Sequence, residues 1–271
     1  MPKPYSMKNL LVPIGSNENA RNTLQYAIEF AREFNSRIYL IHVYSSSKVS
    51  GSFKNVDNII EQDSREILRE HLESVDSEGV EIITSTLKGH SESDTLKQLI
   101  KLLQIDMIIA STKNEGSDES IFIGNNTGNI IKDTEFPVLV IPEEAEFKPL
   151  KKILMTIKSG SIKSLSTLDV LISIQKHFDS TINLLQVKTP KLDSKDLELN
   201  KTLETLVAHR IQTRNATVFQ GVLEHLHEEN PDMLCVIRRK RGFFKKLWQD
   251  DRVKKIDFDS NIPLLVLKGL S

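Results

Sequence analysis

The chain has 271 residues, of which 39% are hydrophobic and 27% are charged. This apolar content is enough for the core of one large domain, or of two domains of about 130 residues. No apolar run approaches the roughly 20 residues of a membrane-spanning helix, and the first residues lack the pattern of a signal peptide, so we expect a cytoplasmic protein with no membrane partner. The one cysteine, Cys235, stands in an apolar run, which predicts a buried thiol and excludes an internal disulfide.

The formal net charge of −1 conceals an uneven distribution along the chain. Residues 1–146 carry 14 Lys and Arg against 23 Asp and Glu, whereas residues 147–271 carry 22 against 14. The change falls in residues 142–149, a stretch rich in proline and glutamate that has no helical or strand periodicity. A change of charge at such a connector predicts two domains, the first at 1–146 and a shorter second one at 147–271.

Short apolar runs alternate with amphipathic helical patterns along the first part of the chain. The runs expected to form buried strands are residues 10–14, 38–43, 80–87, 107–110 and 138–141. The helices expected between them lie near residues 24–34, 57–75 and 96–103, with a short further helix after Gly124. Because parallel strands need crossover connections, this alternation predicts an α/β fold in which helices cover both faces of a parallel sheet.

The second part of the chain repeats the first. Residues 151–159 (KKILMTIKS) echo residues 8–16 (KNLLVPIGS), residues 180–188 echo residues 36–44, and residues 232–263 have the same length as residues 106–137. The expected strands here are residues 153–157 and 182–187, and the expected helices lie near residues 165–172, 197–207 and 218–226. Two copies of one domain, joined head to tail, account for these correspondences.

A glycine turn, a short helix and an apolar strand follow one another in residues 121–142, IFIGNNTGNIIKDTEFPVLVIP. Phosphates bind at such turns, because backbone N–H groups at a helix N-terminus point at the ligand. FIGNNT (residues 122–127) and PVLVI (residues 137–141) resemble the C-terminal signature of the universal stress protein family, and the resemblance extends over essentially the whole chain as a tandem member. It implies the strand order 3-2-1-4-5 in each five-stranded sheet. It also implies that the final strands, residues 138–141 and 264–267, meet as the edges of an internal pseudo-dimer.

The resemblance also implies where a nucleotide site would lie. Nucleotide-binding members are similar to one another in a Gly-x2-Gly-x9-Gly-Ser/Thr loop and in an aspartate at the end of the first strand. In the first domain the loop positions and the aspartate position are held by Ser111, Asn114, Gly124, Asn125 and Gly15. In the second domain the same positions are held by Ile237, Lys240, Asp250, Asp251 and Lys158.

These substitutions predict a damaged nucleotide site in the first domain and none in the second. Ser111 and Asn114 add side chains where glycine would let the backbone approach the phosphates. Asp250 and Asp251 would repel a phosphate from the place it would take at a helix N-terminus. An ordinary helix cap is the preferred interpretation of Asp250 or Asp251.

The run RRKRGFFKK, which begins at Arg238 and ends at Lys246, indicates a different class of function. Its basic and aromatic side chains could bind phosphates and stack on bases, as an anion or nucleic-acid patch. A solvated loop has the same composition, and no recognition helix or RNA-binding motif accompanies the run, so we expect no nucleic-acid partner. The histidines predict no metal site, because His225 and His227 point in different directions on a helix, and His42 reads as a structural residue.

No nucleophile elbow, acid pair or lysine-type phosphate loop is present, so we expect no enzyme. With the resemblance, this predicts a non-catalytic universal stress protein without a cofactor, acting as a stress-response regulatory or interaction module on unknown protein partners, as a pseudo-dimer or a homodimer. The alternative is a stress switch that binds ATP or AMP in the first domain. Anion or nucleic-acid binding through the basic run is the third hypothesis.

Overall fold

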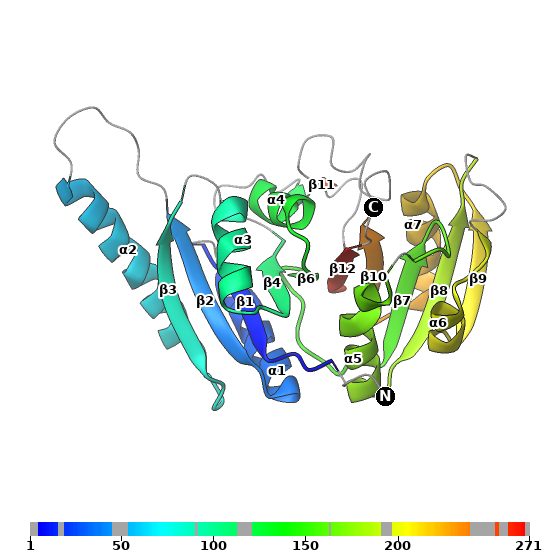
Figure 1. Ribbon diagram of the computed structural model, residues 1–271, viewed down its shortest axis with the longest axis horizontal. Helices are drawn as coiled ribbons and strands as arrows, with labels where there is room; N and C mark the ends of the chain where they lie inside the picture. Colours follow the sequence, from blue (N-terminus) through cyan, green and yellow to red (C-terminus); the bar gives the residue numbers. More distant parts are fainter. Residues whose placement is uncertain are drawn as a thin grey trace.

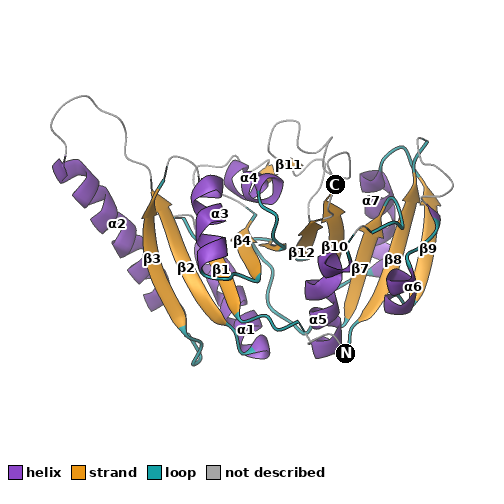
Figure 2. Cartoon of the chain, viewed as in Figure 1, coloured by secondary structure: helices purple, strands orange, loops and turns teal. Residues whose placement is uncertain are grey.

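The computed structural model describes residues 5–15, 19–44, 54–89, 92–112, 121–162, 164–190, 197–238, 253–254 and 260–268. Within these residues the chain forms a ten-stranded sheet, a separate two-stranded ribbon, and helices that cover both faces of the large sheet (Figures 1 and 2). Among the helices described, none is long and apolar enough to cross a membrane.

The first half of the chain builds one side of the sheet. Its elements are β1 (Asn9–Pro13), α1 (Ala20–Phe34), β2 (Arg37–Tyr44), α2 (Lys54–Glu73), β3 (Ile82–Lys88), α3 (Glu92–Leu102), β4 (Met107–Ser111), β5 (Ile121–Ile123), α4 (Asn125–Asp133) and β6 (Val138–Ile141). The strands of the large sheet lie side by side in the order β3-β2-β1-β4-β6, and every neighbouring pair is parallel. With β6 as the fifth long strand, this is the predicted order 3-2-1-4-5.

The second half builds the other side in the same way. Its elements are β7 (Lys152–Ile157), the 3-10 helix η1 (Leu165–Leu168), α5 (Asp169–Phe178), β8 (Thr181–Lys188), α6 (Lys201–Leu206), β9 (His209–Arg214), α7 (Val218–Glu229), β10 (Met233–Arg238), β11 (Val253–Lys254) and β12 (Leu264–Lys268). Its strands lie in the order β12-β10-β7-β8-β9. The predicted α/β fold with two repeated sheets is confirmed, and the position of the domain boundary stays a prediction.

The resemblance implies five strands in the second half, but no strand is predicted at residues 209–214, which form β9. Its sequence, HRIQTR, contains one apolar residue, Ile211, and its side chains alternate between exposed and half-buried. An edge strand has one neighbour and a small share of the core, so apolar content alone does not reveal it.

The two halves meet through their final strands. β6 and β12 pair antiparallel, with Leu139 opposite Leu265 and Val140 opposite Leu264. Because β4 and β10 flank this pair on either side, both final strands are buried and the ten strands form one continuous sheet. The predicted contact between the final strands is confirmed, and it removes two apolar edges that would otherwise invite aggregation.

Helices α1 and α5 pack against each other below this junction (Figure 1). The rings of Phe34 and Phe178 meet edge to face with centroids 5.7 Å apart, and Phe147 lies 6.3 Å from Phe178. At the rim of this cluster His177 Nε2 lies 2.9 Å from the Glu33 carboxylate. The core on this face of the sheet therefore runs without interruption from one half of the chain into the other.

The internal repeat of the sequence reappears in the hydrogen bonds. Asp106, just before β4, accepts a hydrogen bond at 2.9 Å from the backbone N–H of Asn9 at the start of β1. Asp232, just before β10, accepts one at 2.8 Å from the N–H of Lys152 at the start of β7. An aspartate at the equivalent position therefore links the equivalent pair of strands in each half: β4 to β1 in the first and β10 to β7 in the second. This is expected if each half is a copy of one domain.

Candidate functional site

The glycine turn of the first half lies against the end of β4. The N–H of Gly124 donates to Thr112 O at 2.7 Å, and the hydroxyl of Thr127 donates to Ser111 O at 2.7 Å. These two bonds hold the first turn of α4 beside the carboxyl end of the strand. The structure therefore brings together Ser111, Gly124 and Asn125, as the sequence predicts, whereas Asn114 lies outside the described residues.

The first residues of α4 face solvent. Asn125 and Asn126 are exposed, and among the described residues no side-chain hydrogen bond caps the helix at Gly124. The first N–H groups of a helix have no partner within it, so this end has the general chemistry of an anion site.

The position of the expected nucleoside acceptor offers no carboxylate. At Gly15 an added Cβ would meet nothing within 4 Å, so the backbone there does not itself require glycine. The backbone oxygen of Gly15 lies 3.0 Å from His71 Nε2, on the last turn of α2. Sequence reasoning did not foresee this contact, because His71 lies 56 residues away and in no motif.

In the second half the chain itself closes the corresponding loop. Gly160, after β7, accepts a hydrogen bond from the Asn200 N–H at 3.2 Å, and a Cβ built on Gly160 would lie 2.2 Å from Glu198 O. The segment 197–200 is held there because Leu197 O accepts from Arg210 Nη2 at 2.6 Å. The backbone of residues 198–200 therefore lies against Gly160, two residues beyond Lys158, which holds the position of Gly15.

The turn equivalent to Gly124 is also changed in the second half. Ile237 is buried at the end of β10 and Lys158 is half-buried after β7, whereas Lys240, Asp250 and Asp251 lie outside the described residues. Two residues beyond Asp251 the chain forms β11, which pairs antiparallel with β5. The interpretation of Asp250 or Asp251 as a helix cap falls on residues outside the described ones, so it stays a prediction.

Arg238, the first residue of the basic run, forms hydrogen bonds within the protein. From the end of β10 its guanidinium donates to Lys132 O and to Thr134 O, the latter at 3.2 Å, at the C-terminal end of α4. Burial lowers the pKa of Arg238, although Asp133 and Glu135 lie nearby. The guanidinium satisfies carbonyl groups that a helix leaves unpaired at its C-terminus, so Arg238 fastens the second half of the chain to the helix of the first-half turn.

We expect Arg238→Met to lower the free energy of unfolding by about 1–2 kcal/mol, because hydrogen bonds from a charged donor are lost and two carbonyl groups lose their partner. Arg238→Lys should recover only part of the loss, since an ammonium group lacks the planar fork that reaches two carbonyls. Arg214→Met, at an exposed position of β9, is the matched control. Urea unfolding of the variants measures the differences, and equal losses at both arginines would contradict this role.

His42 and His225 contact neighbouring polar side chains of the protein. His42 Nδ1 contacts the Ser64 hydroxyl on α2, which agrees with the structural role expected for it. On α7, His225 Nδ1 lies 3.6 Å from the Glu228 carboxylate, while His227 is exposed. Across the part of the chain that the structure describes, no group of three or more His, Cys, Asp or Glu could hold a metal ion.

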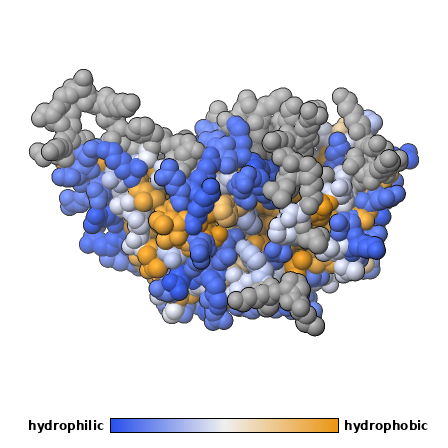
Figure 3. Space-filling model, viewed as in Figure 1, coloured by the Kyte–Doolittle hydropathy of each residue, from blue (hydrophilic) through white to orange (hydrophobic). Residues whose placement is uncertain are grey.

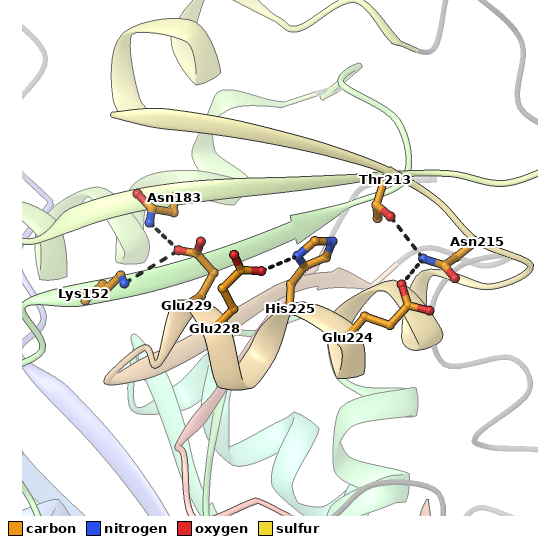
Figure 4. Close-up of polar contacts among 8 residues, drawn as sticks. All are labelled: Lys152, Asn183, Thr213, Asn215, Glu224, His225, Glu228 and Glu229. Atoms are coloured by element: carbon orange, nitrogen blue, oxygen red, sulfur yellow. Dashed lines mark hydrogen bonds and ion pairs between the residues drawn. The ribbon is translucent and has the colours of Figure 1, made fainter.

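Polar contacts on α7 fasten this helix to the sheet (Figure 4). Glu229 accepts a hydrogen bond from Asn183 Nδ2 at 2.5 Å and pairs with Lys152 at 3.7 Å, so it links α7 to β8 and β7. Near the other end of the helix Asn215 donates to Glu224 at 2.9 Å. In this view Glu229 and Glu224 accept hydrogen bonds from asparagine side chains of the protein itself.

Cys235 is fully buried, as predicted, and burial raises the pKa of its thiol.

Comparisons with known proteins agree with the fold. The model of the universal stress protein family matches residues 7–142. A universal stress protein of Methanocaldococcus jannaschii is 24% identical over 139 residues, which cover 49% of this chain and 81% of the relative. The aligned residues thus span one of the two copies.

Solved structures match over nearly the whole chain. A universal stress protein from Archaeoglobus fulgidus superimposes with a TM-score of 0.70 at 16% identity, covering 97% of each chain. A Pseudomonas aeruginosa protein of unknown function superimposes with a TM-score of 0.58 at 13% identity, covering 97% of this chain and 93% of its own. At this identity the two structures establish the tandem fold, and the family model establishes the membership. The chain belongs to the universal stress protein family.

Proposed function

We propose that this protein is a non-catalytic universal stress protein that acts as a regulatory or interaction module and holds no ATP or AMP. The observation that carries the proposal is the closure of the second-half loop, where Glu198 and Asn200 lie against Gly160. Backbone at residues 198–200 leaves no room for a ligand atom where a side chain of residue 160 would stand. The two domains of the proposal are residues 1–146 and 147–271.

The first domain supports the proposal in a different way. Its α4 N-terminus is open, but Gly15 supplies no carboxylate to accept from a nucleoside, and Ser111 stands where glycine would let the backbone approach a phosphate. A helix N-terminus without these partners has the chemistry to attract an anion but not to select a nucleotide. The same open N-terminus favours the alternative, ATP or AMP binding by the first domain, over nucleic-acid binding, since Arg238 is engaged on α4.

We expect millimolar ATP or AMP to leave the melting temperature unchanged. A site of micromolar affinity would add about 4 kcal/mol to the stability at millimolar ligand, which is a large shift of the melting curve. The purified protein should likewise release no nucleotide on denaturation, as judged by absorbance and mass spectrometry. Inorganic phosphate at the same ionic strength is the control for a general effect of anions.

A shift with ATP that phosphate does not reproduce would replace the proposal by the alternative. The variant Gly124→Val should then abolish the shift, because its side chain would stand at the turn where the phosphate approaches.

A further inference from the structure

The ten-stranded sheet ends in two open edges. Because β6 and β12 pair with each other, the outermost strands are β3 in the first half and β9 in the second. Among the described residues no strand pairs with the outer side of either one. Each therefore presents a row of backbone N–H and C=O groups on which a further strand can pair.

The hydrogen bonds to β2 show which residues of β3 face outward. The N–H of Ile38 donates to Glu81 O, and the N–H of Gly89 donates to Tyr44 O, each at 2.9 Å. The odd-numbered residues of β3 therefore point their backbone groups at β2, since these groups alternate in direction along a parallel strand. The backbone groups of its even-numbered residues, among them Thr84 and Thr86, point to the open side.

The two edges differ in charge. β3, with the sequence IITSTLK, contains no charge before Lys88, which is paired with Asp57 of α2 at 2.6 Å. β9 carries His209, Arg210 and Arg214, and charged side chains of this kind keep an edge strand from pairing with its own kind. β3 also has no proline and no bulge, and its one charge, Lys88, lies at its end, where it pairs with α2.

We propose that β3 is a homodimer interface, on which β3 of a second copy pairs antiparallel around a twofold axis at Ser85. This register sets Thr84 of one copy opposite Thr86 of the other, with their outward backbone groups in hydrogen-bonded pairs. It sets Ile83 opposite Leu87 in the closer, non-hydrogen-bonded pairs, which occur twice because the interface is symmetric. The strand is thus complementary to itself, and no other partner is needed to satisfy its edge.

The surface beside this edge agrees with a second copy as the occupant. Figure 3 shows an apolar patch over α3 and the neighbouring strands β2 and β3. Tyr39, Val43 and Leu87 are partly buried on this face, and Leu102 of α3 is 78% exposed. Antiparallel pairing about the twofold axis continues the face from one copy to the next, so Ile83 and Leu87 of each copy gain apolar neighbours. Association through one shared edge also closes at two copies.

Sedimentation equilibrium over a series of concentrations tests the proposal. We expect the mass to rise from 30.8 kDa towards twice that value and to stop there. The double variant Thr84→Lys with Thr86→Lys should stay at the mass of one chain, because like charges then lie opposite each other. The double variant Thr84→Glu with Thr86→Glu should do the same. An equimolar mixture of the two should restore the doubled mass, because Lys then faces Glu in every pair.

The variant Leu102→Lys tests whether the dimer depends on the strand edge or on the apolar patch, because it places a charge on the apolar face and leaves β3 unchanged. We expect this variant to dimerise like the parent chain. A single-chain mass at every concentration would overturn the proposal, and so would growth beyond two copies, which would indicate open-ended pairing of β3 with β9. The proposal would also be overturned if both double variants still formed dimers. It would be overturned as well if only Leu102→Lys prevented dimerisation, because the interface would then lie outside β3.

Discussion

Replacing Leu265 by alanine is expected to lower the free energy of unfolding by about 3–4 kcal/mol, as for other leucines whose removal leaves a cavity in a full core. Leu265 lies on β12, is fully buried, and stands opposite Leu139 in the antiparallel pair with β6. On its other side it neighbours Cys235 of β10. The cavity would therefore open where the two halves of the chain share one core.

Urea unfolding followed by fluorescence and by circular dichroism measures this loss. The midpoint should fall while the slope stays constant, and both probes should coincide, because one continuous core makes the halves unfold together. Leu102→Ala is the matched control, since Leu102 is 78% exposed and its loss should cost less than about 0.5 kcal/mol. Two separate transitions in the parent chain, or a loss at Leu265 no larger than at Leu102, would contradict this account.

The large sheet could be predicted because most of its strands are short apolar runs buried on both faces. β4 and β6 illustrate this, since nearly every residue in them is buried. β9 and β11 escaped prediction for the opposite reason. HRIQTR is an edge strand, and Val253–Lys254 pairs only because β5 offers an open edge 130 residues earlier in the chain. The sequence of such a strand contains no pattern that would identify the strand with which it pairs.

The candidate site could be predicted only where its residues are close in sequence. Gly124 and Asn125 belong to one turn, and Ser111 ends the strand that the turn packs on, so the pattern placed them correctly. The cap that Arg238 makes on α4 depends on how the two halves join. The loop closure at Gly160 depends on the path of the shortened crossover before α6. Neither is a property of a local pattern, so neither was foreseen.

The shortened crossover places backbone beside Gly160, which is the basis of the proposal that the second half holds no nucleotide. In the first half α2, of 20 residues, forms the crossover between β2 and β3. In the second half α6, of six residues, is the corresponding helix, and the chain before it lies at Gly160 instead.

Gly160→Ala is expected to lower the free energy of unfolding by about 3 kcal/mol, at the upper end of the cost of overpacking, because the new methyl group would meet backbone rather than a flexible side chain. The contacting atoms are Glu198 O at 2.2 Å and Leu199 Cα at 2.9 Å. To relieve the contact the segment 197–200 must move away, which breaks the bond from Asn200 N–H to Gly160 O.

Gly15→Ala is the matched control, because it places the same methyl group in the loop after the first strand of the other half, where nothing lies within 4 Å. Its effect should be within about 1 kcal/mol and in the stabilising direction, since alanine restricts the unfolded chain more than glycine does. Hydrogen exchange should also become faster at the Asn200 amide in Gly160→Ala and stay unchanged there in Gly15→Ala. If the two variants were equally stable and the Asn200 amide kept its protection, the segment 197–200 would not be what closes the second-half loop, and the case against a nucleotide there would lose its main support.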